Sequence, residues 1–302
     1  NNLTGTGGRN AIDGSVYFQG YVDGVSSDYL KIPDSDDLDM GTGDFSFECW
    51  LKSVKHAGTA DPNAMGIISS WSYAAGGILI QNKSTGPLRI VIPLSGGGYL
   101  DVNGTTSLWG DWNHIAVERS SGTLKGYVNG IEEISTSYAV GVDFALGGSC
   151  TIGENGPSSY LGDYPLRGHI SNLRICKGHA VYNGAFTPPT RALEVHPGPD
   201  DDRTVVFCCY SSQDATQEAT GKTLAPMPNS AGPLASTFVP DVGNDHTHGT
   251  VLEGGTAFTS LNYMTLPRGT TTQSNRGRAV IAGGYNPTNS PVASRSLNTI
   301  EY

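Results

Sequence analysis

Few residues of this sequence could support catalysis, and their spacing forms no known catalytic motif. There is no Gly-x-Ser-x-Gly nucleophile turn, no His-Glu-x-x-His zinc motif and no glycine-rich phosphate loop. The adjacent Glu132 and Glu133 would point to opposite faces of a strand, so they do not form a carboxylate pair. His114 has no nucleophile or carboxylate beside it, and we expect it to make a structural hydrogen bond. We therefore predict that the chain has no catalytic residues.

Sugar binding requires a different chemistry, in which aromatic rings stack on the sugar beside amide and carboxylate acceptors in a shallow groove. Five aromatic residues lie in stretches that are typical of loops, and they are the candidates for this stacking: Trp71, Tyr73, Trp109, Tyr160 and Tyr164. The alternative for each ring is that it caps a loop or is buried at a contact between subunits.

Two groups of residues have side chains suited to metal ions. Glu154, Asn155 and Asp163, in GENGPSSYLGDY, carry the oxygen ligands that calcium prefers, although ordinary turn chemistry explains them equally well. His246 and His248 are two positions apart, so both rings would lie on one face of a strand. Around a threefold axis, three copies of this pair would offer their imidazoles to one metal ion; the alternative is a polar loop. We expect no cofactor to be required.

The elements that would hold these residues are short strands. From about residue 15 to 210, apolar and polar residues alternate in stretches that are each ended by Gly, Pro or Asn. In the stretch 45–52, FSFECWLK, the odd-numbered residues are apolar, which predicts a strand with one buried and one solvent-facing side. The other stretches are 15–18, 28–32, 66–71, 77–82, 88–92, 99–102, 169–176 and 204–210. Because no stretch shows an apolar pattern at helical spacing, we predict an all-β, antiparallel, two-sheet sandwich.

Residues 111–130, DWNHIAVERSSGTLKGYVNG, show the sandwich pattern most clearly. We expect Trp112 to pack beneath the turn at one end of this stretch. The core-facing residues are Ile115, Val117, Leu124 and Val128. At the other end, Asn129-Gly130 predicts a two-residue hairpin turn, because both residues tolerate a positive φ.

Composition and charge exclude several classes of function. The chain of 302 residues has a formal net charge of −10 and no cluster of lysine and arginine, so we expect no nucleic-acid partner. No apolar stretch approaches the roughly 18 residues of a membrane span, and we expect no membrane partner. The five cysteines match no zinc spacing, which predicts reduced thiols in a protein made in a cytoplasm.

Three separated motifs, in the correct order, resemble a known family. Residues 16–53 are similar to its opening strands, residues 111–130 to its W-x-H-[IV]-A hairpin, and residues 166–190 to its closing strand and tail. Over about residues 10–210 the sequence resembles laminin-G-like, concanavalin A-like jelly-roll domains. The resemblance implies an antiparallel two-sheet jelly roll with a lectin-like, carbohydrate-binding role.

Some enzymes share this jelly roll, notably the retaining β-glucanases. They require two carboxylates about 5 Å apart, which they carry as Glu-x-Asp-x-x-Glu on one strand. No glutamate of this sequence is followed two positions later by an aspartate. A glycan hydrolase is therefore the weaker alternative to a binding protein.

The remaining resemblance is to phage proteins. FCCYSSQDAT, residues 207–216, resembles the strand that follows this domain in virion proteins of marine cyanobacterial phages, and residues 258–285 resemble the segment that introduces kelch-like repeats there. This implies a virion structural protein, a capsid-surface or tail-fibre subunit that is made in the host cytoplasm and located on the virion surface. Its partners would be other virion proteins and host surface glycans. A stand-alone carbohydrate-binding lectin is the alternative.

The sequence divides into three parts. Residues 10–210 are the expected jelly roll, and residues 211–240 are polar and Pro/Ala/Ser-rich, which predicts an extended linker or wrapping segment. Residues 241–302 predict a small β segment, either an oligomerisation element or the start of the kelch-like repeats. Its short strands leave edges that need a partner, so we predict a homo-oligomer, with a trimer favoured; a flexible tail on a monomer is the alternative.

Overall fold

The computed structural model describes residues 12, 14–20, 28–55, 64–70, 76–146, 148–155, 165–199, 202–227 and 232–240. They form two antiparallel sheets, and the single 3₁₀ turn Asp36–Leu38 is the only helical element among the described residues. The predicted all-β, two-sheet jelly-roll architecture is confirmed. All described residues belong to the unit Asn1–Pro240; the second unit, Asp241–Tyr302, lies outside them. No helix in the described part of the chain is long and apolar enough to cross a membrane.

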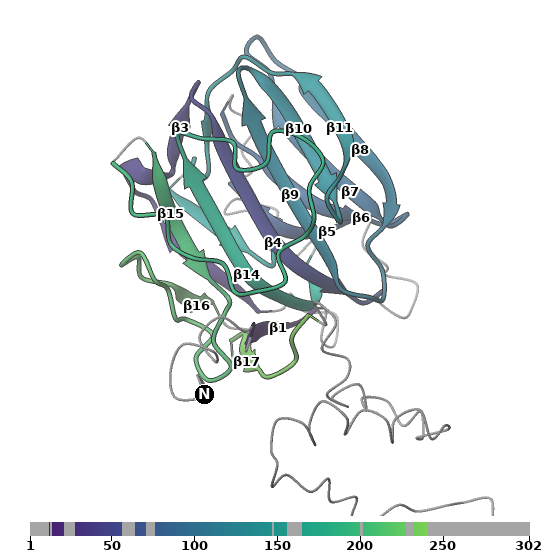
Figure 1. Cartoon of the computed structure of the whole chain (residues 1–302), viewed down its shortest axis with the longest axis vertical. Helices are drawn as coiled ribbons and strands as arrows, with labels where there is room; N and C mark the ends of the chain where they lie inside the picture. Colours follow the sequence, from purple (N-terminus) through teal and green to yellow (C-terminus); the bar gives the residue numbers. More distant parts are fainter. Residues whose placement is uncertain are drawn as a thin grey trace, which may run out of the picture. The chain divides into compact units, whose positions relative to one another are not determined.

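The first sheet has eight strands. They are β1 (Ser15–Gln19), β4 (Phe45–Ser53), β9 (Asn113–Ser120), β10 (Thr123–Val128), β11 (Ile131–Ser137), β14 (Arg167–Lys177), β15 (Arg203–Cys208) and β17 (Leu234–Ser236). Their order is β11-β10-β9-β4-β14-β1-β17, and β15 also pairs with β14 (Figure 1). On the side of β14 away from β4, β1 pairs with the first half of the strand and β15 with the second half. Between the halves β14 bulges after Ser171, where Asn172 has a φ of 51°.

The second sheet has seven strands. They are β2 (Tyr29–Pro33), β5 (Ala64–Ser69), β6 (Leu79–Lys83), β7 (Pro87–Pro93), β8 (Tyr99–Ser107), β13 (Ser149–Ile152) and β16 (Ala225–Met227). Their order is β16-β2-β13-β5-β6-β7-β8, and a separate small pair joins β3 (Asp39–Gly41) to β12 (Val142–Asp143). The strand β8 is therefore an edge of this sheet.

The core lies between the two sheets, where the inward side chains of both are buried. The four odd-numbered apolar residues of β4 have no exposed surface, as their alternation predicted. The predicted core residues of the hairpin are also buried: Ile115, Val117, Leu124 and Val128. Asn129 and Gly130 have φ values of 51° and 80° and join β10 to β11 in the predicted two-residue turn. All five cysteines are free and buried.

The other side of β4 differs from the prediction, because it does not face solvent. Ser46, Glu48 and Trp50 are only 2%, 1% and 8% exposed. The expectation of a solvent-facing side was wrong because the chain after β14 crosses the outside of this sheet before it enters β15 (Figure 1). We call this crossing segment, of which residues 178–199 are described, the tail.

Hydrogen bonds trace the path of the tail. The Ser46 hydroxyl on β4 donates to the carbonyl of His179 (3.0 Å), and the amide of Phe186 donates to the carbonyl of Gly130 beyond β10 (2.9 Å). The tail then returns to β14, where the Leu193 amide donates to the Asn172 side chain (3.1 Å). A Cβ on Gly130 would lie 1.8 Å from the carbonyl oxygen of Phe186, so this close approach requires glycine.

Residues 211–227 and 232–240 pack on the same sandwich. They supply β16, which pairs with β2, and β17, which pairs with β1, so each sheet gains its last strand on this side from this segment. Beyond β17, Phe238 stacks on Trp112 with ring centroids 5.7 Å apart. Trp112 therefore packs against this segment, and not simply beneath the turn as expected.

Candidate functional site

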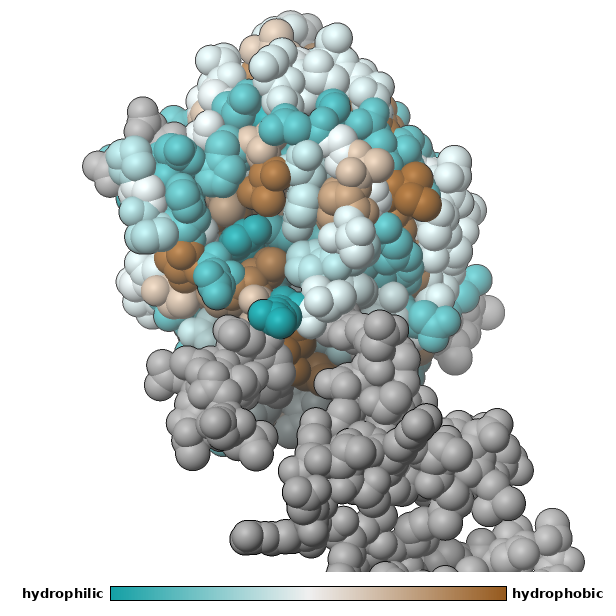
Figure 2. Space-filling view, viewed as in Figure 1, coloured by the Kyte–Doolittle hydropathy of each residue, from teal (hydrophilic) through white to brown (hydrophobic). Residues whose placement is uncertain are grey.

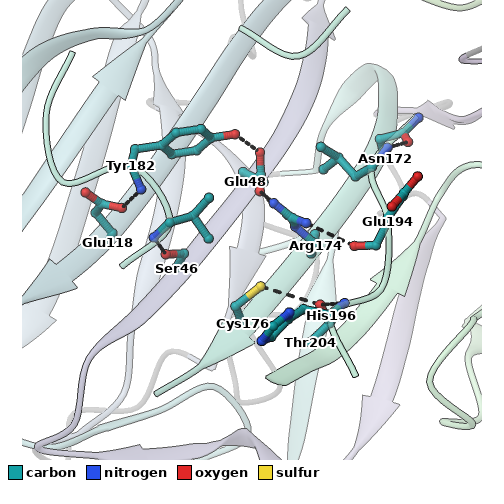
Figure 3. A network of polar contacts seen from close by, with 12 residues as sticks. Ser46, Glu48, Glu118, Asn172, Arg174, Cys176, Tyr182, Glu194, His196 and Thr204 are labelled. Atoms are coloured by element: carbon teal, nitrogen blue, oxygen red, sulfur yellow. Dashed lines mark hydrogen bonds and ion pairs between the residues drawn. The ribbon is translucent and has the colours of Figure 1, made fainter. Parts of the chain in front are cut away.

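The outer face of the first sheet carries a buried charged group, the carboxylate of Glu48. Arg174 on the neighbouring strand donates from Nε to Glu48 Oε1 (2.9 Å), and His114 Nε2 lies 3.2 Å from Oε2. The hydroxyl of Tyr182, from the tail, donates to the same carboxylate oxygen as His114. Figure 3 shows Glu48 between Tyr182 and Arg174, each pointing at one end of the carboxylate. Three elements of the fold thus meet at one anion.

The ionisation of this group follows from its partners. Burial raises the pKa of Glu48, but the hydrogen bond from His114 and the positive charge of Arg174 outweigh burial and leave the pKa below its usual value. Burial, followed by the charge of Glu48, raises the pKa of the Tyr182 phenol. The carboxylate is therefore ionised and the phenol protonated at neutral pH, which is the arrangement that a donated hydrogen bond requires.

A second buried carboxylate, Glu118 on β9, holds the next turn of the tail. Its oxygens accept from the amides of Tyr182 (3.1 Å) and Asn183 (2.7 Å) and from the hydroxyl of Tyr127 (3.0 Å). The Tyr182 ring stacks on Phe186 with centroids 3.5 Å apart. Both carboxylates are thus used in anchoring the tail and are covered by it. Seen from outside, this face of the molecule carries small patches of hydrophobic residues among hydrophilic ones (Figure 2).

The outer face of the second sheet carries a different arrangement, which we call the polar row: Asn155, Gln81, Arg89, Asp101 and Asn103. Gln81 on β6 donates to Asn155 Oδ1 (2.5 Å), and Arg89 on β7 donates from Nη1 to Gln81 Oε1 (3.2 Å). Arg89 also forms a bidentate salt bridge with Asp101 on β8, in which Nε donates to Oδ1 (3.0 Å) and Nη2 to Oδ2 (2.7 Å). Asn103 donates to Asp101 Oδ1 at 3.3 Å.

The polar row runs from the protein interior to solvent. Gln81 and Asn155 are buried, whereas the side chains of Arg89 and Asp101 are 24% and 32% exposed. The hydrogen bond from Arg89 lowers the pKa of Asp101, so this carboxylate is ionised at neutral pH. Buried amides thus orient a guanidinium that in turn holds a solvent-facing carboxylate. Such fixed, partly exposed donors and acceptors can hydrogen-bond the hydroxyl groups of a sugar.

The described site candidates from the sequence lie apart from the exposed end of the polar row. Trp109 is half-buried and packs against the core, beside Gly86 in the turn between β6 and β7. Asn155 belongs to the polar row, where its side-chain oxygen accepts from Gln81. Glu154 is fully buried, and its backbone carbonyl accepts from the Thr151 hydroxyl (3.3 Å).

Metal binding gains no support from this part of the chain, since no group of three or more His, Cys, Asp or Glu that could hold a metal occurs among the described residues. The other candidates lie outside the described residues: Trp71, Tyr73, Tyr160, Asp163, Tyr164, His246 and His248. Their expected roles in sugar or metal binding stay predictions.

The sequence contained a signal for the polar row that its interpretation did not use. In the stretch 99–103 Asp101 and Asn103 alternate with apolar residues, and Arg89 lies between the apolar Leu88 and Ile90, which places all three on the outer face. Alternation does not give the register between strands. Only the pairing of Arg89 opposite Asn103 and of Val91 opposite Asp101 brings the three side chains together.

Comparisons with known proteins agree with this fold. A structure from Bacteroides ovatus, described as that of a candidate carbohydrate-binding protein, is similar with a TM-score of 0.54 and 17% identity. The similarity covers 77% of this chain, which spans 61% of that protein. Mouse laminin alpha1 domains LG4-5 (TM-score 0.39, 14% identity, 62% of this chain and 48% of that one) show weaker similarity.

Domain 4 of AbnA, an extracellular arabinanase of Geobacillus stearothermophilus solved with arabinotriose, is similar with a TM-score of 0.38 and 22% identity, over 60% of this chain and 82% of that one. A search of curated proteins finds no match. The model of one family, described as the concanavalin A-like lectin/glucanases superfamily, matches residues 22–187, which is more than half of the chain. The chain therefore belongs to the concanavalin A-like lectin/glucanase superfamily.

Proposed function

We propose that this chain is a non-enzymatic, glycan-binding subunit of a virus particle, in which the jelly roll attaches the virion to host surface glycans. The observation that carries the proposal is the contrast between the two outer faces. The tail covers the first sheet and buries its carboxylates Glu48 and Glu118, whereas the polar row of the second sheet ends in solvent-exposed side chains. The accessible polar chemistry is thus that of a binding surface.

The placement on a virion rests on the sequence. The tail and closing-strand motif of residues 166–190 and the stretch 207–216 resemble phage structural proteins. In the structure, Tyr182 of the tail donates hydrogen bonds to the buried carboxylates Glu48 and Glu118, which holds the tail against the first sheet. The partners in this proposal are other virion proteins, host glycans and further copies of the chain, with a trimer favoured.

The test combines two measurements. Purified protein is applied to an array of bacterial surface polysaccharides and their oligosaccharides, and mass spectrometry measures its amount in purified particles of the phage that encodes it. We expect saturable glycan binding without release of sugar, and a fixed number of copies per particle. Binding without particle incorporation would indicate a stand-alone lectin, and release of sugar would indicate a hydrolase; either result contradicts the proposal.

A further inference from the structure

The edge strand β8 presents three polar or aromatic side chains in line on the outer face of the second sheet. Tyr99, Asp101 and Asn103 alternate with Leu100 and Val102, which pack against the core. Tyr99 is 55% exposed, one of the few large hydrophobic residues that face solvent in the described part of the chain. Because alternate residues of a strand are about 6.5 Å apart, the three side chains form a strip about 13 Å long.

Each position of the strip offers a different contact to a sugar. The Tyr99 ring can stack on the apolar face of a sugar ring. The bidentate salt bridge from Arg89 holds Asp101 in place. Asp101 can still accept a further hydrogen bond, since a carboxylate has about four acceptor positions. The amide oxygen of Asn103 makes no hydrogen bond to the described residues, so Asn103 presents a donor and an acceptor side by side.

Asp101, the central residue of the strip, is held in place before any ligand arrives, because the buried part of the polar row supports it. Gln81 accepts from Arg89 and donates to Asn155, so the guanidinium that orients Asp101 is itself fixed from behind. Only the first half of β8 is open to a ligand along its edge. In the second half, Glu133 of the other sheet accepts from the amides of Thr105 and Thr106 (2.7 and 3.1 Å). Preorganised side chains lose less conformational entropy on binding.

The net charge of the whole chain favours an uncharged ligand over an anionic one. Arg89 and Asp101 neutralise each other, and the nearby Lys83 adds one positive charge that helps to lower the pKa of Asp101. The whole chain has a formal net charge of −10, which repels anionic polysaccharides at long range. Hydroxyl groups satisfy the exposed groups of Asp101 and Asn103 without adding charge.

From this geometry we propose that the outer face of β8 binds an uncharged oligosaccharide lengthwise, with one sugar stacked on Tyr99 and the next ones hydrogen-bonded to Asp101 and Asn103. The inference rests on the proposed glycan-binding function and locates its site. It assigns the primary contacts to strand residues, whereas the sequence suggested loop aromatics.

The test measures the affinity of the full chain for the best neutral oligosaccharide from the array, by calorimetry. We expect Tyr99→Ala and Asn103→Ala each to weaken binding by roughly three- to tenfold, and Tyr99→Phe to retain it, because the phenyl ring still stacks. We expect Arg89→Ala to weaken it as well, because Asp101 loses its support.

Matched controls come from the other sheet. Ile131→Ala on β11 truncates a side chain that is 65% exposed. Lys125→Ala breaks the exposed ion pair with Glu132 (3.3 Å), which resembles the Arg89–Asp101 pair in exposure. We expect neither to change the affinity.

The outcomes separate this inference from the proposed function. If the wild-type protein binds the glycan and the β8 variants bind it equally well, the strip is not the site, but the protein is still a lectin. If the best ligand on the array is anionic, the assignment of an uncharged ligand is wrong. If the wild-type protein binds no glycan, the proposed function itself fails.

Discussion

The hydroxyl of Tyr182 donates a hydrogen bond to the carboxylate of Glu48, although the two residues are 134 positions apart in the sequence. Tyr182 comes from the tail and Glu48 from the middle of the first sheet, so this bond closes a loop through most of the domain. Because Glu48 is buried and ionised, the bond that it accepts from the half-buried Tyr182 is of the charge-assisted kind. The tail is thus a structural part of the sandwich.

The first prediction concerns this bond. Tyr182→Phe removes the hydroxyl and keeps the ring stacked on Phe186. We expect the free energy of unfolding to fall by about 1.5–3 kcal/mol, the usual range for a hydrogen bond to a charged group. Urea denaturation followed by tryptophan fluorescence measures it. Tyr17→Phe is the control, since the Tyr17 hydroxyl makes no hydrogen bond to the described residues. Equal stabilities for both variants and the wild type would contradict the prediction.

The second prediction concerns the charge of Glu48. Glu48→Gln keeps the shape but leaves the guanidinium of Arg174 without its carboxylate, and we expect a loss of about 3 kcal/mol. The double variant Glu48→Gln with Arg174→Met should recover part of this loss, because no unpaired charge is then left buried.

The same carboxylate affects acid stability. Its pKa lies below the usual value in the folded state, so its stabilisation is complete above the pKa of the unfolded chain and is lost as the pH falls through the folded pKa. Glu48→Gln should therefore lose less stability than the wild type on acidification. Glu132→Gln, on the exposed face of β11, serves as the control. A wild-type acid dependence in Glu48→Gln would show that the carboxylate does not titrate as expected.

The sequence predicted the inward half of this fold better than the outward half. Inward residues such as Ile115 and Leu124 alternate with polar ones, and any sandwich must bury them. The fate of the outward residues depends on what covers the sheet. Glu48 looked solvent-facing because the tail that covers it shows no periodicity, and its path is fixed by side chains distant in the sequence, such as Ser46 and Asn172.

The candidate site shows the same limit. The sequence predicts sugar stacking by loop aromatics. The exposed Tyr99 lies on a strand instead, and only the strand register shows which polar side chains lie beside it. Alternation places Arg89 and Asp101 on an outer face but does not pair them. The pairing follows from the turn between β7 and β8, which sets Ile92 opposite Leu100.

The third prediction is a pH dependence that originates at His169. Burial, with a smaller contribution from the charge of Lys52, lowers the pKa of His169 from 6.5 to about 4. The ring packs against Phe238 and Tyr17, and Ser15 lies within hydrogen-bond distance of it. A lowered pKa means that the unfolded chain takes up the proton first, so stability falls as the pH drops from 6.5 towards 4.

His169→Phe removes this titration and keeps an aromatic ring in place. We expect the wild type to lose about 1–2 kcal/mol more than this variant between pH 7 and pH 4.5, after allowance for solvent screening. Lys52→Met should reduce the loss only slightly, because burial is the larger cause. Parallel stability curves for wild type and His169→Phe, measured by urea denaturation at each pH, would rule out this origin.

The last prediction concerns where the sandwich ends. Residues 211–240 supply β16 and β17, and they bury Ala215 and Leu224 against the core. A chain cut after Tyr210 loses both strands and exposes the edges of β1 and β2, and exposed edges pair with other chains. We expect this version to unfold at a lower temperature and to aggregate. A chain cut after Pro240 keeps both strands and should retain the melting temperature of the sandwich.

The two cuts also test self-association. Light scattering on the full chain and on the version that ends at Pro240 isolates the contribution of residues 241–302, because the sandwich is intact in both. If the full chain is a trimer and the shorter one a monomer, the oligomerisation element lies in those residues. If both have the same mass, that element lies elsewhere or is absent. Equal stability of the versions cut at Tyr210 and Pro240 would contradict the role assigned to β16 and β17.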